Sequence, residues 1–468
     1  MSISWYDFLI MSGIINGSVV PSVKENVINW NYDDEKRRVE NHLETLSINF
    51  ISNSESIIIL DPNMEFDQID PLLQKNYRGG RESGEPNITR DIDLVEPPMR
   101  GVVVQINRLG LITTGSCAGH IRQNRRTLPW LTFITRKDTQ IALELFKSFS
   151  IPVQYHFLNG IQLNAERDEL YQLSLRLSEI RSIDHIKDNI FETKKRTLFD
   201  LLRIPGKTGN EEAVREYVLD ELEKINSKRR YLDFRVDDAG NILGSTISPR
   251  IKSRNYGRSN GAPCKKMLLA AHLDVKSEFS PSDQLIVKDN IISRQKGILG
   301  ADDRAGVAII LNLLKEVGNF RDIPSLKFIF TVGEEEGQYG AESIDPDFFE
   351  DVSFGISLDR RSCHDVVYKS RFQDYATYEF AEQIARLSRS IFTEENRYVP
   401  CEGGISDLRV WSEKDARPCV NLSVGYFDEH TDDEKLDIIC WDRTHQLVAE
   451  LIGKFSLGQG FRGRLGAG

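Results

Sequence analysis

A short apolar stretch that ends in three glutamates constrains this chain more than any other feature. Residues 326–332, LKFIFTV, are rich in β-branched and aromatic side chains, and Glu334, Glu335 and Glu336 follow after one glycine. Such a run predicts a buried β-strand. Acidic side chains just beyond the C-terminal end of such a strand lie where open α/β sheets bind their ligands. A solvated acidic loop is the alternative interpretation.

Length and composition favour a soluble protein of two domains. The chain has 468 residues, of which 40% are hydrophobic and 28% are charged, and this length exceeds what one ordinary core needs. The net charge of −11 disfavours a nucleic-acid partner, and no apolar run is long enough to span a membrane. The N-terminus lacks a basic segment before its apolar residues, and the six cysteines form no C-x-x-C pair. We therefore expect a cytoplasmic protein with reduced thiols.

Residues 1–190 predict a smaller α+β domain, to which the sequence assigns no function. We expect strands over residues 55–60, 100–106 and 128–136, and helices over residues 34–46 and 165–180.

The segment GSCAGH, residues 115–120, pairs Cys117 with His120. Such a pair could bind a metal or act as a nucleophile and its base. With no further ligand nearby in the sequence, a structural turn is the simpler interpretation.

Residues 191–456 alternate between predicted strands and helices. The strands cover residues 267–271, 326–332, 352–358 and 418–424, and the helices cover residues 304–317, 374–392 and 441–455. This alternation predicts an α/β domain with a mostly parallel central sheet covered by helices on both faces. We expect polar loops over residues 74–98 and 249–263, and a flexible Gly-rich tail over residues 457–468.

Side chains able to bind metals or move protons follow the ends of several predicted strands. They are His272, Asp274, Asp302, Asp303, Glu334, Glu335, Asp359 and His430. Each has an ordinary explanation: Asp302 and Asp303, for example, could simply cap a helix. Because all of them fall at the same kind of place, we expect a nitrogen and oxygen ligand set that suits zinc, cobalt or manganese.

The segments HLD, GADDRAG, FTVGEEEG and SLD, with the late histidine, resemble the signature of the co-catalytic zinc peptidases. This superfamily contains the M20, M28 and M42 peptidases, including peptidase T-like and leucyl-type aminopeptidases. The resemblance covers residues 195–455, does not extend to residues 1–190, and implies a zinc exopeptidase-like fold. Only 30 positions separate His272 from Asp302 and 71 separate Asp359 from His430. These gaps hold no inserted lid domain, so the domain is expected to have the compact M28-type arrangement.

The resemblance also implies a site for two divalent ions, for which zinc is the first candidate and cobalt or manganese the alternatives. His272 and Asp359 would hold one ion, Glu335 and His430 would hold the other, and Asp302 would bridge them.

The resemblance assigns the proton chemistry to two further acids. Glu334 would be the general base for a hydroxide that bridges the two zinc ions. Asp274 would accept the second ring proton of His272. Glu334 and Glu335 should point to opposite sides of an extended segment. Glu336 stands at a position that is usually apolar in the family, and Asp303 follows what is often a cis peptide.

Three residues are candidates for substrate contact. Arg360, like Arg361, follows a predicted ligand and could bind a substrate carboxylate or balance the acidic site. Ser406 and Asp407 lie in GGISDLRVW, residues 403–411, which matches a Gly-Gly-Thr/Ser-Asp segment of the family. Helix capping is the alternative for both.

We therefore expect a cytoplasmic metallopeptidase that hydrolyses peptide bonds. The leading interpretation is an aminopeptidase that acts on short peptides. One alternative is an N-acyl amino acid deacylase or carboxypeptidase of the same fold, and another is a binding protein without catalysis. The sequence leaves open the substrate, the native metal and the oligomeric state.

Overall fold

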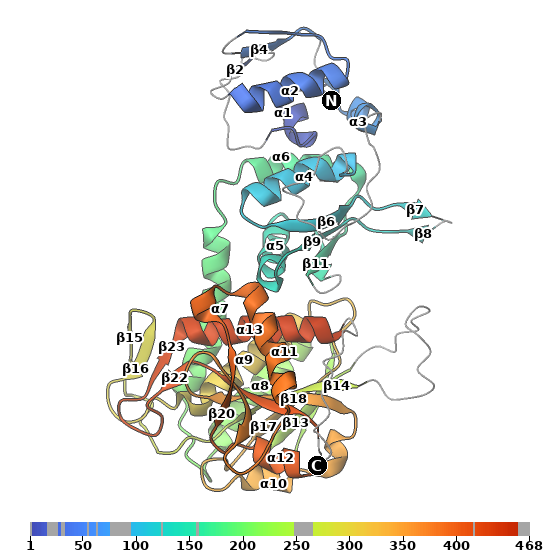
Figure 1. The fold of residues 1–468 in the computed structure, drawn as a ribbon. Helices are drawn as coiled ribbons and strands as arrows, with labels where there is room; N and C mark the ends of the chain where they lie inside the picture. Colours follow the sequence, from blue (N-terminus) through green and yellow to red (C-terminus); the bar gives the residue numbers. More distant parts are fainter. Residues whose placement is uncertain are drawn as a thin grey trace. The chain divides into compact units, whose positions relative to one another are not determined.

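The computed structural model describes residues 2–15, 27–29, 33–53, 56–61, 64–74, 95–122, 125–155, 159–247, 265–414 and 417–456. Most of the predicted loop at residues 74–98 lies outside them, as do the loop at residues 249–263 and the tail at residues 457–468. The chain divides into two compact units, Met1–Ile190 and Phe191–Gly468 (Figure 1).

The first unit combines short antiparallel strands with helices. Its four-stranded sheet has the order β10 (Val153–Tyr155), β11 (Gly160–Leu163), β9 (Trp130–Phe133) and β6 (Thr113–Cys117). The helices of this part are α4 (Pro97–Arg108), α5 (Arg136–Ser148) and α6 (Arg167–Ser178), and a hairpin joins β7 (Ile121–Arg122) to β8 (Arg125–Arg126).

A second layer of the first unit has a core of its own. A three-stranded sheet has the order β2 (Val27–Asn29), β4 (Ser56–Ile59) and β3 (Phe50–Ser52), and β1 (Ser2–Ile3) pairs with β5 (Met64–Glu65). The helices here are α1 (Trp5–Met11), α2 (Asp33–Thr45) and α3 (Ile69–Gln74). Phe8, Leu43 and Ile57 pack together in this core, because each element buries one apolar face.

The strand predicted over residues 100–106 is wrong, because these residues lie in helix α4. The run Val102-Val103-Val104 favours strand by propensity. Burial instead has helical spacing, with Met99, Val102, Val103 and Ile106 all buried. Two prolines start the helix. Tertiary packing against α6 therefore overrides the local preference.

The second unit contains an eight-stranded sheet. Its order is β12 (Leu232–Val236), β13 (Ile242–Thr246), β17 (Leu326–Thr331), β14 (Lys266–His272), β18 (Val352–Arg360), β21 (Cys419–Ser423), β19 (Asp365–Ser370) and β20 (Val399–Gly403). The four central strands, β17, β14, β18 and β21, run parallel, and antiparallel pairs occur toward the two edges. The predicted α/β fold with a mostly parallel sheet is confirmed.

Helices cover both faces of this sheet (Figure 1). They are α7 (Asp184–Leu202), α8 (Glu212–Lys228), α9 (Ala301–Val317), α10 (Tyr339–Ser343), α11 (Tyr378–Ile391), α12 (Leu408–Lys414) and α13 (Ile438–Ser456). On one face α9 packs against β14 and β18 and is itself covered by α8 and α13. On the other face Ala341 of α10 and Trp411 of α12 pack with Leu268 and Ile329 of the sheet. A small sheet, β15 (Leu285–Lys288), β16 (Ile291–Arg294), β23 (Lys435–Asp437) and β22 (Tyr426–Phe427), completes the unit.

The expectation of reduced cysteines is wrong for one pair. Cys363 and Cys440 form a disulfide across 77 positions of sequence, a long-range pairing that spacing along the chain cannot reveal. Cys117, Cys401 and Cys419 are not in disulfides.

None of the helices in the described parts of the chain is long and apolar enough to cross a membrane.

Candidate active site

The ends of the parallel strands bring the predicted metal-binding side chains to one edge of the large sheet. His272 ends β14, Asp359 lies near the end of β18, and Glu335 lies in the turn after β17. Asp302 lies in the first turn of α9. This helix can approach β18 because Gly306 has no side chain: a Cβ there would lie 2.1 Å from the carbonyl oxygen of Leu358. The peptide bond between Asp302 and Asp303 is cis, as the resemblance implies.

The first ligand group joins His272, Asp302 and Asp359. The Nε2 atom of His272 lies 3.1 Å from Oδ1 of Asp302 and 3.5 Å from Oδ1 of Asp359. Burial favours neutral His272, but the carboxylates of Asp274, Asp302 and Asp359 outweigh it and raise the pKa of His272 above its ordinary value. For Asp359 burial dominates and raises the pKa.

The second ligand group joins Asp302, Glu335 and His430. The Nε2 atom of His430 lies 3.2 Å from Oδ2 of Asp302 and 2.9 Å from Oε1 of Glu335. Hydrogen bonding to these two carboxylates raises the pKa of His430 to about 10. His430 has a φ of +64°, which is uncommon for a residue with a side chain.

The two groups share one residue, Asp302, whose two carboxylate oxygens face different groups. Within each group the three candidate ligand atoms lie within 4.8 Å of one another. The donors are imidazole nitrogens and carboxylate oxygens, which suit zinc, cobalt or manganese. Oε1 of Glu335 is buried and faces Nε2 of His430 at 2.9 Å. Because two imidazole nitrogens and three carboxylates converge at such short distances, the residues present fit a bound cation.

Asp274 supports both His272 and the glutamate turn. Its backbone oxygen lies 3.0 Å and its Oδ1 lies 3.4 Å from Nδ1 of His272. Its carboxylate also accepts the backbone N–H groups of Glu334 and Glu335, each at 3.1 Å, and the hydroxyl of Thr208 at 2.8 Å. Asp274 therefore orients the histidine and ties the turn to the end of β14.

Glu334 and Glu335 do not lie on an extended segment, so that expectation is wrong. Both belong to a turn, which begins after Gly333, a residue with a φ of +65°. A left-handed glycine ends the strand and turns the chain. The turn gives the two carboxylates different surroundings, because Glu335 faces His430 whereas Glu334 lines a cavity.

This cavity, of about 240 Å³, lies beside both ligand groups. Asp302, Asp359 and His430 line it, together with Glu334. Burial raises the pKa of Glu334 to about 8, with further contributions from nearby carboxylates. A carboxyl group with a raised pKa next to a cation site is suited to take up and return a proton.

The three predicted substrate-contact residues differ in whether they line the cavity. Arg360 lines the cavity, and its Nε donates to Oδ2 of Asp365 at 2.9 Å. Ser406 and Asp407 are buried and do not line the cavity. Asp407 accepts the hydroxyl of Thr331 at 2.5 Å, and burial raises its pKa to about 7. Their neighbours Gly404 and Ile405 line the cavity instead.

The sequence did not reveal several residues that support the site. Tyr426 donates to Oδ1 of Asp359 at 3.3 Å, and Asn421 donates to the Asp359 carbonyl at 2.8 Å. Glu434 accepts the backbone N–H groups of Gly300 and Asp302. None of these three residues belongs to a sequence pattern that could have pointed to its role.

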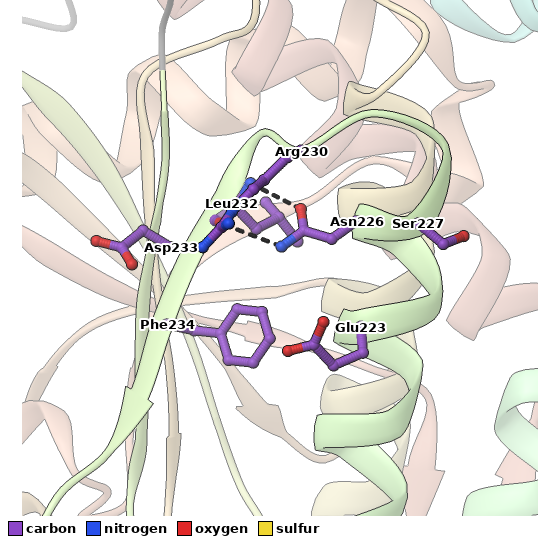
Figure 2. A pocket seen from close by; sticks show the side chains of 7 residues that line it. All are labelled: Glu223, Asn226, Ser227, Arg230, Leu232, Asp233 and Phe234. Atoms are coloured by element: carbon purple, nitrogen blue, oxygen red, sulfur yellow. Dashed lines mark hydrogen bonds between the residues drawn. The ribbon is translucent and has the colours of Figure 1, made fainter.

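A larger cavity in the same unit has no ligand group. Its volume is about 480 Å³. Figure 2 shows the residues that line it, which are Glu223, Asn226, Ser227, Arg230, Leu232, Asp233 and Phe234. Asn226 bonds to the backbone N–H and carbonyl of Leu232 and so ties α8 to β12. No histidine or cysteine is among these residues, whereas His430 and the candidate ligands Asp302 and Asp359 line the smaller cavity, which is therefore the candidate active site.

Comparison with solved structures gives several similar chains. Aminopeptidase PepT from Bacillus cereus has 16% identity and a TM-score of 0.44, covering 56% of this chain and 98% of its own. A tripeptidase from Staphylococcus aureus has 17% identity and a TM-score of 0.47, with coverages of 57% and 99%. The TET1 peptidase from Pyrococcus horikoshii has 15% identity and a TM-score of 0.42, with coverages of 55% and 99%.

Sequence comparison gives a family match for part of the chain. No curated protein matches the sequence. Residues 256–454 match Peptidase family M28, and all five candidate ligands lie within that range. The predicted resemblance of the second unit to the co-catalytic zinc peptidases is therefore confirmed by this match to an M28 family.

Proposed function

We propose that the second unit is a metal-dependent exopeptidase, an aminopeptidase that acts on short peptides. One observation carries the proposal: the two oxygens of the Asp302 carboxylate face two separate groups of ligand atoms. Such an arrangement suits a pair of divalent cations that share one bridging carboxylate.

The ligand roles follow from these distances. His272 and Asp359 would hold one ion, Glu335 and His430 would hold the other, and Asp302 would contact both. Zinc fits the mixture of imidazole and carboxylate donors. When bound, the two ions would polarise the scissile carbonyl and make a water molecule acidic near neutral pH.

Glu334 would move the protons. Its carboxylate lies in the cavity and is not needed as a ligand. It would accept a proton from the attacking water and then donate it to the leaving amine, so that one side chain serves both steps. Asp274 would keep Nε2 of His272 directed at its ligand group by holding the opposite ring nitrogen.

The cavity supports a small substrate. Its volume of about 240 Å³ is below the usual range for sites that enclose a drug-sized ligand. Such a space suits one terminal residue of a peptide. The choice of the amino end rests on the similarity of the motifs GADDRAG and FTVGEEEG to aminopeptidase members of the superfamily.

Arg360 and Arg361 favour a second candidate, an N-acyl amino acid deacylase or carboxypeptidase. Both line the cavity, and guanidinium groups bind carboxylates well. Each already contacts an acid, Arg360 with Asp365 and Arg361 with Glu429, at 2.9 and 2.8 Å. Because both guanidinium groups already have an acidic partner within the protein, we rank the aminopeptidase first.

One metal-replete assay separates these functions. The full chain, reloaded with zinc, is offered tripeptides with a free amine, with an acetylated amine and with an amidated carboxyl end. An aminopeptidase cleaves the first and third substrates, whereas an enzyme that needs a substrate carboxylate rejects the amidated one. No hydrolysis by the fully zinc-loaded chain would overturn the proposal and favour a binding protein.

A further inference from the structure

Outside the active site, the first unit brings a carboxylate, a thiol and an imidazole together. Glu96 immediately precedes α4, Cys117 ends β6, and His120 follows three residues later. One ligand atom from each of the three lies within 4.8 Å of the others. Oε1 of Glu96 is 2.9 Å from Nε2 of His120. The sequence pointed to Cys117 and His120 alone, and the fold adds Glu96 from 21 positions earlier.

The backbone holds these side chains in place. Glu96 Oε2 accepts the N–H of Ala118, which ties the carboxylate to the turn between Cys117 and His120. The backbone N–H of His120 donates to Oγ1 of Thr127 at 2.8 Å, and the N–H of Thr127 donates to the His120 carbonyl at 2.7 Å.

Gly119 allows the tight turn on which both residues depend. Its φ is +77°, and a Cβ at this position would lie 2.5 Å from the Thr127 carbonyl oxygen. Only glycine fits both conditions. The turn thus presents Cys117 and His120 on the same side, toward Glu96.

The turn also holds the sulfur of Cys117. Sγ accepts the backbone N–H of Gly119 at 3.4 Å. The same glycine therefore fixes the position of Cys117, whose thiolate would be the metal ligand, and that of His120.

The ligand atoms of this group lie close enough together to share one ion. Nitrogen and oxygen ligands at zinc distances of ~2.0–2.1 Å lie about 3.3 Å apart. The distance of 2.9 Å between Oε1 of Glu96 and Nε2 of His120 is shorter than this, so the two side chains would move slightly apart to hold the ion. A thiolate next to an imidazole and a carboxylate selects zinc over the harder cations magnesium and calcium.

We propose that Glu96, Cys117 and His120 form a zinc site in the first unit, separate from the peptidase site. Three protein ligands leave a fourth position for water or another donor, as in zinc sites that bind a ligand or substrate. The His120 side chain is 39% exposed, so solvent reaches the group. This inference does not rest on the proposed peptidase function.

Two alternative interpretations, a purely structural turn and a nucleophile pair, explain fewer of these observations. A purely structural turn needs the Glu96–Ala118 bond but gives no reason for a thiol at its centre. A nucleophile pair would leave Glu96 to orient the base, and it predicts a thiol that reacts rapidly without any metal.

Cobalt(II) tests the proposal because it reports sulfur ligands. The metal-free full chain is titrated with cobalt while near-ultraviolet absorption is recorded. We expect a thiolate-to-cobalt charge-transfer band whose intensity at saturation corresponds to one cobalt–thiolate site per chain. The active site cannot produce this band because its ligands carry only nitrogen and oxygen. X-ray absorption of the zinc-loaded wild-type chain should likewise show a sulfur neighbour at about 2.3 Å.

Matched variants locate the sulfur. Cys117→Ser should lose the band and one equivalent of bound zinc. Cys401→Ser, which changes a half-buried cysteine of the second unit, should keep both. Cys440→Ser should also keep the band, because Cys440 is paired with Cys363 in a disulfide. His430→Ala, which removes a ligand of the other site, should keep it as well.

Three outcomes would overturn the zinc site. They are no sulfur signal in either spectrum of the wild-type chain, a cobalt band that persists in Cys117→Ser, and rapid alkylation of Cys117 that zinc does not slow. The last would favour the nucleophile pair. Because X-ray absorption uses only the wild-type chain, the test holds even if Cys117→Ser fails to fold.

Discussion

The Oε1 atom of Glu434 accepts the backbone N–H of Asp302 at 3.1 Å, and its Oε2 atom accepts the N–H of Gly300 at 2.8 Å. The first N–H groups of a helix have no partner within the helix. Since Glu434 is buried, its carboxylate supplies partners that water cannot. It thereby fixes the backbone of the residue whose two oxygens face both ligand groups.

Replacing Glu434 by alanine should weaken metal binding and lower stability. The two N–H groups would be left buried without an acceptor, and each such loss costs about 1–3 kcal/mol. Misplacing the ligand that they support should reduce zinc affinity by about 10–100-fold. Glu434→Gln keeps one oxygen acceptor and should fall between alanine and wild type. Zinc-buffered titrations and thermal unfolding measure these effects. Asp433→Asn, at an exposed neighbour, is the control, and wild-type zinc affinity in Glu434→Ala would contradict the role.

Glu334→Gln should almost abolish peptide hydrolysis while the chain keeps its metal. A positioned general base contributes about 10²–10⁴-fold in rate, and the amide cannot take up the proton. We expect kcat/KM to fall by that factor and zinc content to stay at the wild-type level. Glu336→Gln offers a matched control, because Glu336 is exposed in the same turn. A Glu334→Gln enzyme with full activity would rule out this base.

The buried strands of the second unit were predictable, whereas the smaller elements were not. Residues 326–332 are apolar except for Lys327 and Thr331, and β17 is buried along its full length. A strand of this kind shows itself in the sequence because both faces must be apolar. Helix α4 shows the limit, since its three consecutive valines favour strand while its packing requires helix.

The candidate site likewise contains some residues that the sequence reveals and others that it does not. His272, Asp302 and Asp359 could be named because each belongs to a short motif at a strand end. Glu434 could not, because its role depends on a backbone contact across 132 positions. Glu96 meets His120 only through the packing of α4 beside β6. The Cys363–Cys440 disulfide is another long-range pairing. Contacts that the tertiary fold alone creates leave no local pattern.

His430→Ala should lower the metal content. His430 supplies the only nitrogen among the described residues of the second ligand group, and a carboxylate pair alone binds zinc less tightly. We expect the loss of one zinc equivalent after dialysis against a metal buffer. Inductively coupled plasma mass spectrometry measures the zinc content. His185→Ala, an exposed histidine on α7, should change nothing. Full occupancy in His430→Ala would exclude the ligand role.

A buried histidine of the first unit should make that unit sensitive to acid. His42 is 7% exposed, and burial, together with Arg100 and Arg38, lowers its pKa from 6.5 to about 3. The folded unit therefore holds His42 neutral, whereas the unfolded chain takes up a proton below pH 6.5. The stabilisation is complete above pH 6.5 and is lost as the pH falls toward 3. Between pH 7 and pH 5 the loss is about 2 kcal/mol.

Hydrogen exchange of the α2 peptides measures this loss. After correction for intrinsic exchange rates, protection should fall by about 30-fold between pH 7 and pH 5, the equilibrium factor for about 2 kcal/mol. His42→Leu cannot ionise, so this part of the pH dependence should disappear. His185→Leu, an exposed histidine replacement, should leave it unchanged. An equal decline in His42→Leu and wild type would assign the acid sensitivity to other groups.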